Sequence, residues 1–133
     1  RVIISNEHNL ARLAGSLAFL SEGTGHATID IYTGPQPSAG GAVTSQVKLV
    51  RFTLDRPPGT MGASSLSITG AAVGFIVATG VPAWARWANG DGVWAGDSTA
   101  SDELGSGEVK VNTDGLGQLL AGGGCALVSA VMT

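Results

Sequence analysis

The feature that most limits the fold of this chain is a change of hydrophobic period close to Gly25. Over residues 6–20, apolar side chains recur at three- and four-residue spacing, as on one face of an α-helix. This pattern predicts one amphipathic helix over residues 6–20, with Leu10, Leu13 and Leu17 facing inward. After Gly25 the period falls to two, which is typical of β-strands with one buried face.

The strands expected after Gly25 are separated by clusters of Gly, Pro, Asn, Asp and Ser. Residues 27–33 alternate regularly, whereas residues 46–54 carry apolar side chains on both parities and predict a long strand with a β-bulge near Leu49. Further strands are expected at residues 65–69, 73–79, 83–88, 92–95, 108–112 and 124–133. The Asn-Gly-Asp-Gly run at residues 89–92 suits a tight hairpin turn.

One helix followed by eight strands predicts a single, mainly β domain over residues 1–133, an antiparallel β-sandwich of jelly-roll type. The last strand has small or apolar residues on both faces over residues 126–133, so we expect it to be central in a sheet or to pair with a second subunit. One core is expected to contain Ile29, Ile31, Phe52, Ile68, Val109, Val111 and Val128.

The composition favours a chain whose surface is partly covered by a partner. Only 13% of the residues are charged and 44% are hydrophobic, which leaves few charges to keep the surface of a monomer soluble. Self-association is therefore expected, as a dimer in preference to a trimer, because closed twofold symmetry is the commonest arrangement.

Charge and hydropathy also exclude some classes of partner. The net charge of −3 gives no basic footprint for direct binding of nucleic acid. The apolar stretch at residues 70–81 is shorter than the roughly 20 residues that span a bilayer. The apolar run that follows Arg1 is too short for a signal peptide. We therefore expect neither a membrane partner nor secretion.

No pattern in the sequence predicts catalysis, a cofactor or a metal site. Asp30 with Asp97 or Glu108 could be drawn as a glycosidase pair, and Ser129 with His26 as part of a triad, but the supporting spacing and motifs are absent. The acidic residues of the glycine-rich stretch lack EF-hand spacing, and turn formation explains them; they are Asp91, Asp97, Asp102 and Glu103. The lone Cys125 is expected to be a buried, unreactive thiol.

Three tryptophans, Trp84, Trp87 and Trp94, lie in the expected hairpin. Trp84 and Trp87 are three residues apart and should point to opposite faces of one strand, so at most one of them faces the core with Trp94. The other, if exposed, would be an anchor for a protein partner, because tryptophan is enriched where interfaces carry their energy. Core packing and a stacking platform for sugar rings are the alternatives.

Two segments carry a family resemblance: I-D-I-Y-T-G-P-Q-P at residues 29–37, and A-R-W-A-N-G-D-G at residues 85–92 with Gly-Asp at residues 96–97. They resemble a group of small tailed-bacteriophage and prophage structural proteins in which a Y-T-G-P-x-P turn and an A-R-x-x-x-x-D-G hairpin recur in a chain of this length. The helix near the start is similar too. The size also resembles the capsid cement proteins, some of which are jelly rolls.

The resemblance implies a non-enzymatic virion protein, made in the host cytoplasm, that sits on the capsid exterior and binds the major capsid protein. Contacts are expected from the loop at residues 34–41, the tryptophan hairpin and one end of the chain. The alternatives are a neck or tail component and a carbohydrate-binding module. The candidate interface residues are Trp84, Trp87, Trp94, Tyr32, Pro35 and Pro37.

Overall fold

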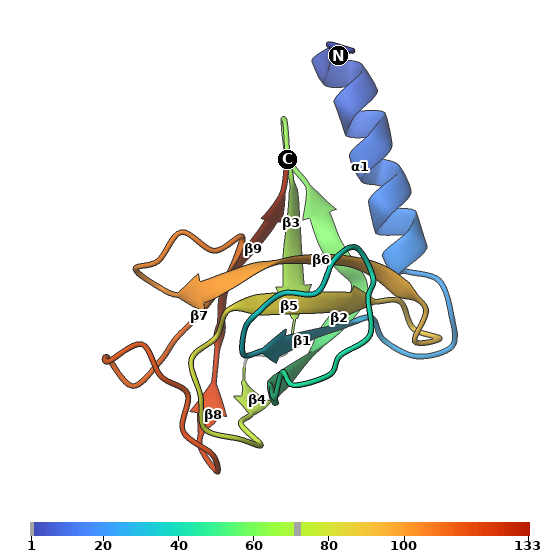
Figure 1. Ribbon diagram of the computed structural model, residues 1–133. Helices are drawn as coiled ribbons and strands as arrows, with labels where there is room; N and C mark the ends of the chain where they lie inside the picture. The colour runs from blue at the N-terminus through green and yellow to red at the C-terminus, as the bar shows by residue number, and fades with distance from the viewer. Residues whose placement is uncertain (1, 71–72) are drawn as a thin grey trace.

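Seven strands of the computed structural model close into one barrel-like sheet with the order β1-β2-β3-β9-β7-β6-β5 (Figure 1). The structure describes residues 2–70 and 73–133, so Arg1 and residues 71–72, near the start of the 70–81 stretch, lie outside it. The elements are α1 (Asn6–Leu20), β1 (Thr28–Tyr32), β2 (Lys48–Met61), β3 (Leu66–Gly70), β4 (Gly74–Phe75), β5 (Trp84–Ala88), β6 (Trp94–Asp102), β7 (Val109–Val111), β8 (Gly124–Cys125) and β9 (Leu127–Met132).

Helix α1 has the bounds that its periodicity predicts. Ser5 caps it by accepting a hydrogen bond from the backbone N–H of His8. Leu13 is buried, and Leu10 and Leu17 pack against the core, which confirms the inward face. The helix lies along β2 and β3, and its N-terminal end points away from the barrel (Figure 1). No helix among the described residues is long and apolar enough to cross a membrane.

Strand β1 lies between β2 and β5 where it was expected, but residues 29–32 are all buried, so both of its faces are covered and the prediction of one buried face is wrong. Ile29 pairs with Phe52 on one side and with Trp87 on the other, and all three are buried. The register of β1 against β2 shifts so that Leu49 is the extra residue, which confirms the predicted bulge.

The mainly β class with one helix is confirmed, but the strand order is that of a closed barrel and the expected sandwich is not seen. Two features produce the closure. Strand β2 continues past Leu54 through an irregular stretch at residues 55–58 and so pairs with both β1 and β3. The short β7 then bridges β6, to which it is parallel, and β9, to which it is antiparallel. The alternation of apolar residues along one strand does not show which strands lie beside it, so the sequence could not predict the closure.

Six of the seven expected core residues are buried, and Val128 is the exception at 51% exposed. The cause is a shift in register between β7 and β9, where Lys110 pairs with Ser129 but Val111 pairs with Leu127. Val128 is therefore the unpaired residue of a bulge, and its side chain turns outward. Strand β9 itself pairs with both β3 and β7, which confirms its central position.

Several strand bounds differ from those expected. The strands expected at residues 46–54 and 92–95 extend to Met61 and Asp102, while the one at 73–79 shortens to β4. The last run divides into β8, which pairs with β4, and β9. The turn at residues 89–92 is confirmed, because the Asn89 side chain accepts hydrogen bonds from the backbone N–H groups of Asp91 and Val93.

Candidate functional site

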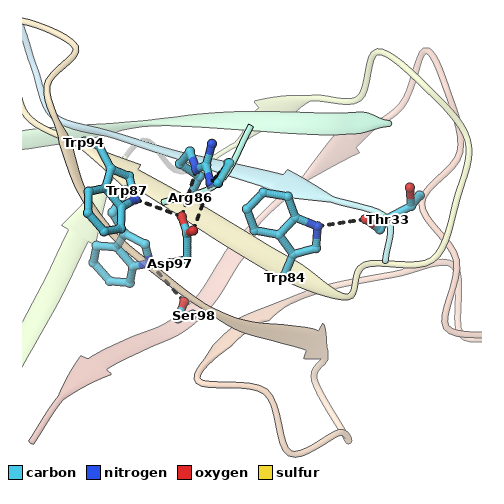
Figure 2. Close-up of polar contacts among 8 residues, drawn as sticks. Thr33, Trp84, Arg86, Trp87, Trp94, Asp97 and Ser98 are labelled. Carbon is cyan, nitrogen blue, oxygen red and sulfur yellow. Dashed lines mark hydrogen bonds and ion pairs between the residues drawn. The ribbon is translucent and has the colours of Figure 1, made fainter. Parts of the chain in front are cut away.

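The three tryptophans take positions other than those expected for an exposed anchor on β5. Trp84 and Trp87 do point to opposite faces, but both are buried, with exposed fractions of 0% and 4%. Trp87 belongs to the interior cluster and donates from Nε1 to the hydroxyl of Ser98 at 2.9 Å (Figure 2). The exposed tryptophan is Trp94 of β6, at 46%.

Trp84 is buried on the outside of the barrel because other groups cover it. Its ring stacks on that of Tyr32, with centroids 4.6 Å apart, and the Arg86 guanidinium lies 5.1 Å from the Trp84 ring centroid. Its Nε1 donates to the carbonyl oxygen of Thr33 at 2.8 Å (Figure 2). Burial, together with the charge of Asp30, raises the pKa of Tyr32. This stack therefore fixes the start of the loop at residues 34–41.

Arg86 and Asp97 form the central ion pair of this outer face. Arg86 donates from Nε and Nη2 to the two Asp97 carboxylate oxygens at 2.8 and 2.9 Å, and Nη2 also reaches the carbonyl oxygen of Gly41 at 2.7 Å. Burial alone would raise the pKa of Asp97, but the hydrogen bonds from Arg86 and Trp94 and the Arg86 charge outweigh it, so this pKa is lowered. The pair joins β5, β6 and the loop.

A second ion pair lies on β1 and β2. Arg51 donates from Nε and Nη2 to the two oxygens of Asp30, at 2.7 and 2.8 Å, and Lys48 Nζ is 3.3 Å from Asp30 Oδ2. Asp30 is buried, whereas the Arg51 side chain is 53% exposed. The carboxylates that could be drawn as a glycosidase pair, Asp30 and Asp97, are therefore each neutralised by a bidentate arginine.

Trp94 is held from two directions while part of its ring stays in solvent. Its Nε1 donates to Asp97 Oδ1 at 3.1 Å (Figure 2). Gly40 of the loop approaches the ring so closely that a Cβ there would lie 3.1 Å from it, and the positive φ of 70° at Gly40 also favours glycine. Trp94 is therefore a fixed aromatic group with an open face.

Trp94 borders a small polar cleft of about 350 Å³. The cleft could present a ring face together with hydrogen-bonding groups to a small polar ligand. Its other lining residues come from β1, β2, β5 and the adjoining turns and are His26, Thr28, Asp30, Arg51, Arg86, Ala88, Asn89, Gly90 and Gly92.

The two candidate prolines lie in the loop that covers this face. Pro35 is exposed and Pro37 is half-buried. The side-chain amide of Gln46 donates to the Pro35 carbonyl oxygen at 2.6 Å, and Thr33 Oγ1 accepts from the backbone N–H of Val47 at 2.9 Å. The start of the loop is thus tied to residues 46–47, just before β2, and its end reaches the outer face of Tyr32, Trp84 and Trp94 through Gly40 and Gly41.

Asp91 and Asp102 of the glycine-rich stretch accept hydrogen bonds from backbone N–H groups, Asp91 from a distant loop and Asp102 within its own turn. Asp91 Oδ1 accepts from the backbone N–H of Thr24, and Asp102 Oδ1 accepts from that of Leu104. Within residues 2–70 and 73–133, no three of the His, Cys, Asp and Glu side chains come together as a metal site would require. Cys125 is fully buried, and burial raises the pKa of its thiol to about 11, as expected for an unreactive cysteine.

The arginine–aspartate pairs are the part of the site that sequence reasoning missed. A signal was present, because Asp30 and Arg86 share strand parity with the aromatic residues Tyr32 and Trp84. This chain has few charges, so charged and aromatic residues that share one strand parity indicate an outer face that other groups cover. In comparisons with protein-family models, curated proteins and solved structures, nothing matches this chain.

Proposed function

We propose that this chain is a non-enzymatic virion structural protein that binds the outer surface of a phage capsid and holds neighbouring major capsid subunits together. The observation that supports this most directly is Trp94, a 46% exposed indole that Asp97 and Gly40 hold in one position. A large aromatic group that is already ordered loses little conformational entropy on binding, and tryptophan is the residue most enriched at interface hot spots.

A second apolar surface supports contacts with more than one neighbour. Val73, Phe75 and Val77 share one parity along and beside β4 and are 62%, 66% and 59% exposed. We name these three residues the apolar stripe. The stripe and Trp94 lie on different elements, which suits a protein that spans adjacent subunits. Binding only the assembled lattice would stabilise that lattice by mass action.

The test compares Trp94→Ala with Leu104→Ala on phage particles stripped of the wild-type protein. Leu104 is 93% exposed, so its substitution removes an apolar side chain outside the Trp94 surface. We expect both variants to fold and Trp94→Ala to bind particles at least about thirtyfold more weakly, as for a hot spot of 2 kcal/mol or more. Equal binding of Trp94→Ala and wild type would contradict the role of Trp94.

The position of the protein on the particle separates a cement protein from a neck or tail component. Cryo-electron microscopy of decorated particles should find it distributed over the shell. Density confined to the tail vertex would support the neck or tail alternative.

A carbohydrate-binding function is the second candidate, and the cleft beside Trp94 favours it. A half-exposed indole next to Arg51 and Asn89 combines a stacking surface with hydrogen-bonding groups, the pattern that sugar sites use. A glycan array distinguishes the candidates: sugar binding that Trp94→Ala abolishes would support the module, and a blank array with retained capsid binding would support the cement protein.

A further inference from the structure

The barrel has a gap on one side, between β6 and β9. Strand β7 separates these two strands over three residues only, and the pairing ends where Ala100 pairs with Val109 and Val109 pairs with Ala130. Beyond that level β6 continues back to Trp94 and β9 continues to Met132, and the pairings of β7 end. Because β7 spaces them, the two strands lie about two strand separations apart, roughly 10 Å, which is the width of one missing strand.

The main chain of β6 is open along this gap. The backbone N–H of Ala100 donates to the carbonyl oxygen of Ala83, the residue before β5, and Ser98 pairs with Ala85, so Asp97 and Thr99 direct their backbone groups away from β5. The side chain of Asp97 is only 3% exposed while the residue as a whole is half-buried, which means that solvent reaches its main chain. At the closed end, the Glu108 carboxylate accepts from the backbone N–H of Thr99 at 3.4 Å, where a strand would otherwise pair.

The gap opens into a groove of about 750 Å³ between β6, β9 and α1. Phe19, Trp87 and Met132 give it apolar walls. Two glycines, Gly15 of α1 and Gly96 of β6, also line it, and a Cβ added at either would meet nothing within 4 Å. The groove therefore offers an unpaired strand edge beside apolar side chains, the features of a site that takes up an extended peptide.

The chain itself contains a segment of the matching type. Residues 2–5, which we name the arm, precede α1 and read Val-Ile-Ile-Ser. Val2 and Ile3 are each 84% exposed, and three consecutive β-branched residues favour an extended strand. The arm of the same copy reaches no farther than the Arg12 end of this groove and cannot lie along β6 beside Gly15. Gly15 lies ten residues beyond Ser5, about 15 Å along the helix, whereas Val2 to Ile4 reach only about 10 Å.

We propose that the arm of a second copy of this chain enters the groove as an added strand between β6 and β9. Its main chain would pair with the open edge of β6, and its β-branched side chains would cover Phe19, Trp87 and Met132. Reciprocal exchange between two copies closes as a twofold dimer. The proposal goes beyond the capsid function and concerns the purified protein alone. The particle-binding test can therefore contradict the capsid function without contradicting arm exchange, and the reverse.

Light scattering coupled to size-exclusion chromatography gives the first test. Wild type should be a dimer, and Val2→Asp with Ile3→Asp should be monomeric. Leu116→Asp, at a site that is 89% exposed elsewhere, should remain dimeric. Gly15→Leu should fold and lose the dimer because its side chain fills the groove, whereas Ala14→Leu, one position along and outside the groove, should keep it. A monomeric wild type, or a dimer that survives in the arm variant, would overturn the proposal.

Cross-linking between copies tests where the arm goes. Cys125 is buried, so an introduced cysteine is the reactive one. Protein carrying Ile3→Cys, mixed with protein carrying Gly96→Cys and mildly oxidised, should give a disulfide-linked heterodimer, whereas Leu116→Cys with Gly96→Cys should not. Equal yields from both mixtures, or none from the first, would count against an arm seated in the groove.

Discussion

At the residue scale, the ion pairs of the described residues gather on one face of the barrel and use five charged side chains, Asp30, Lys48, Arg51, Arg86 and Asp97. Arg86 with Asp97 and Arg51 with Asp30 are both bidentate, and both lie on the outer face of β1, β2, β5 and β6. Arginine suits these places because its planar guanidinium meets both carboxylate oxygens at once. Asp97 also accepts a hydrogen bond from the Trp94 indole, and Arg86 also donates to the carbonyl oxygen of Gly41. One ion pair therefore orders a strand, a loop and the exposed indole.

The lowered pKa of Asp97 predicts a pH-dependent contribution to stability. Because the folded pKa lies below the unfolded value of about 3.9, the contribution is fully present above pH 4 and is lost as pH falls through the folded pKa. We expect Asp97→Asn to be less stable than wild type at pH 7 and the difference in unfolding free energy to shrink toward pH 2. Urea titrations followed by tryptophan fluorescence at both pH values measure it.

A matched control for the pH experiment is Asp55→Asn, which changes an exposed carboxylate away from this network. Its difference from wild type should be small at both pH values. A gap between Asp97→Asn and wild type that is equally wide at pH 7 and at pH 2 would show that the ionised form of Asp97 is not what stabilises the fold.

At the scale of elements, helix α1 is held by one apolar face against β2 and β3, and its other side is open. Gly15 weakens it, because glycine in a helix interior costs about 1 kcal/mol relative to alanine. Within one copy a Cβ at Gly15 meets open space, so in the monomeric variant carrying Val2→Asp and Ile3→Asp, where no arm fills the groove, Gly15→Ala should stabilise α1 by about that amount. Hydrogen exchange of the α1 amides should slow about fivefold.

The neighbouring substitution Ala14→Gly, in the same turn of the helix, should destabilise α1 instead of stabilising it. Exchange of the α1 amides should accelerate by a similar factor in the same monomeric variant, because both positions are exposed and lie in the interior of the helix. Faster exchange in Gly15→Ala would mean that the open side of α1 is already in contact with something that a methyl group displaces.

The elements with a regular period could be predicted from the sequence, and those that depend on a partner strand could not. Helix α1, β1 and the bulge at Leu49 follow from local alternation alone. Strand β6 was expected to end at Ala95, because Gly96 and Asp97 read as turn residues, yet pairing with β5 and the Arg86 ion pair carries the strand to Asp102. The outward turn of Val128 likewise depends on register with β7.

The candidate site was predictable in composition but not in exposure. The sequence placed Tyr32, Trp84 and Trp94 among the interface candidates, and the structure brings them to one outer face. The sequence could not show that Arg86 and the loop at residues 34–41 cover Trp84, because the loop lies far from Trp84 along the chain. The prediction of one exposed tryptophan on β5 therefore failed, while Trp94 on the paired strand is the exposed one.

At the scale of the whole molecule, the barrel has apolar packing on both sides of the same strands. Trp87 fills the interior beside Ile29, and Trp84 is covered outside by Tyr32 and Arg86, yet both tryptophans belong to β5. Strand β5 pairs with β1 and β6, so loss of either layer weakens the same two ladders. Interior and outer cover should therefore unfold as one cooperative unit.

This coupling predicts that Trp84→Ala and Trp87→Ala destabilise the fold to a similar extent. Each removes a side chain that is no more than 4% exposed and should lower the unfolding free energy by about 3 to 5 kcal/mol. Trp94→Ala, at a half-exposed ring, should cost under about 1 kcal/mol, as surface substitutions usually do. In urea, fluorescence and far-ultraviolet circular dichroism should give coincident transitions for all three variants. Two results would contradict this: a Trp84→Ala protein as stable as wild type, or one whose fluorescence changes at a lower urea concentration than its circular dichroism. Either would mean that the outer cover folds separately and that the barrel interior alone sets the stability.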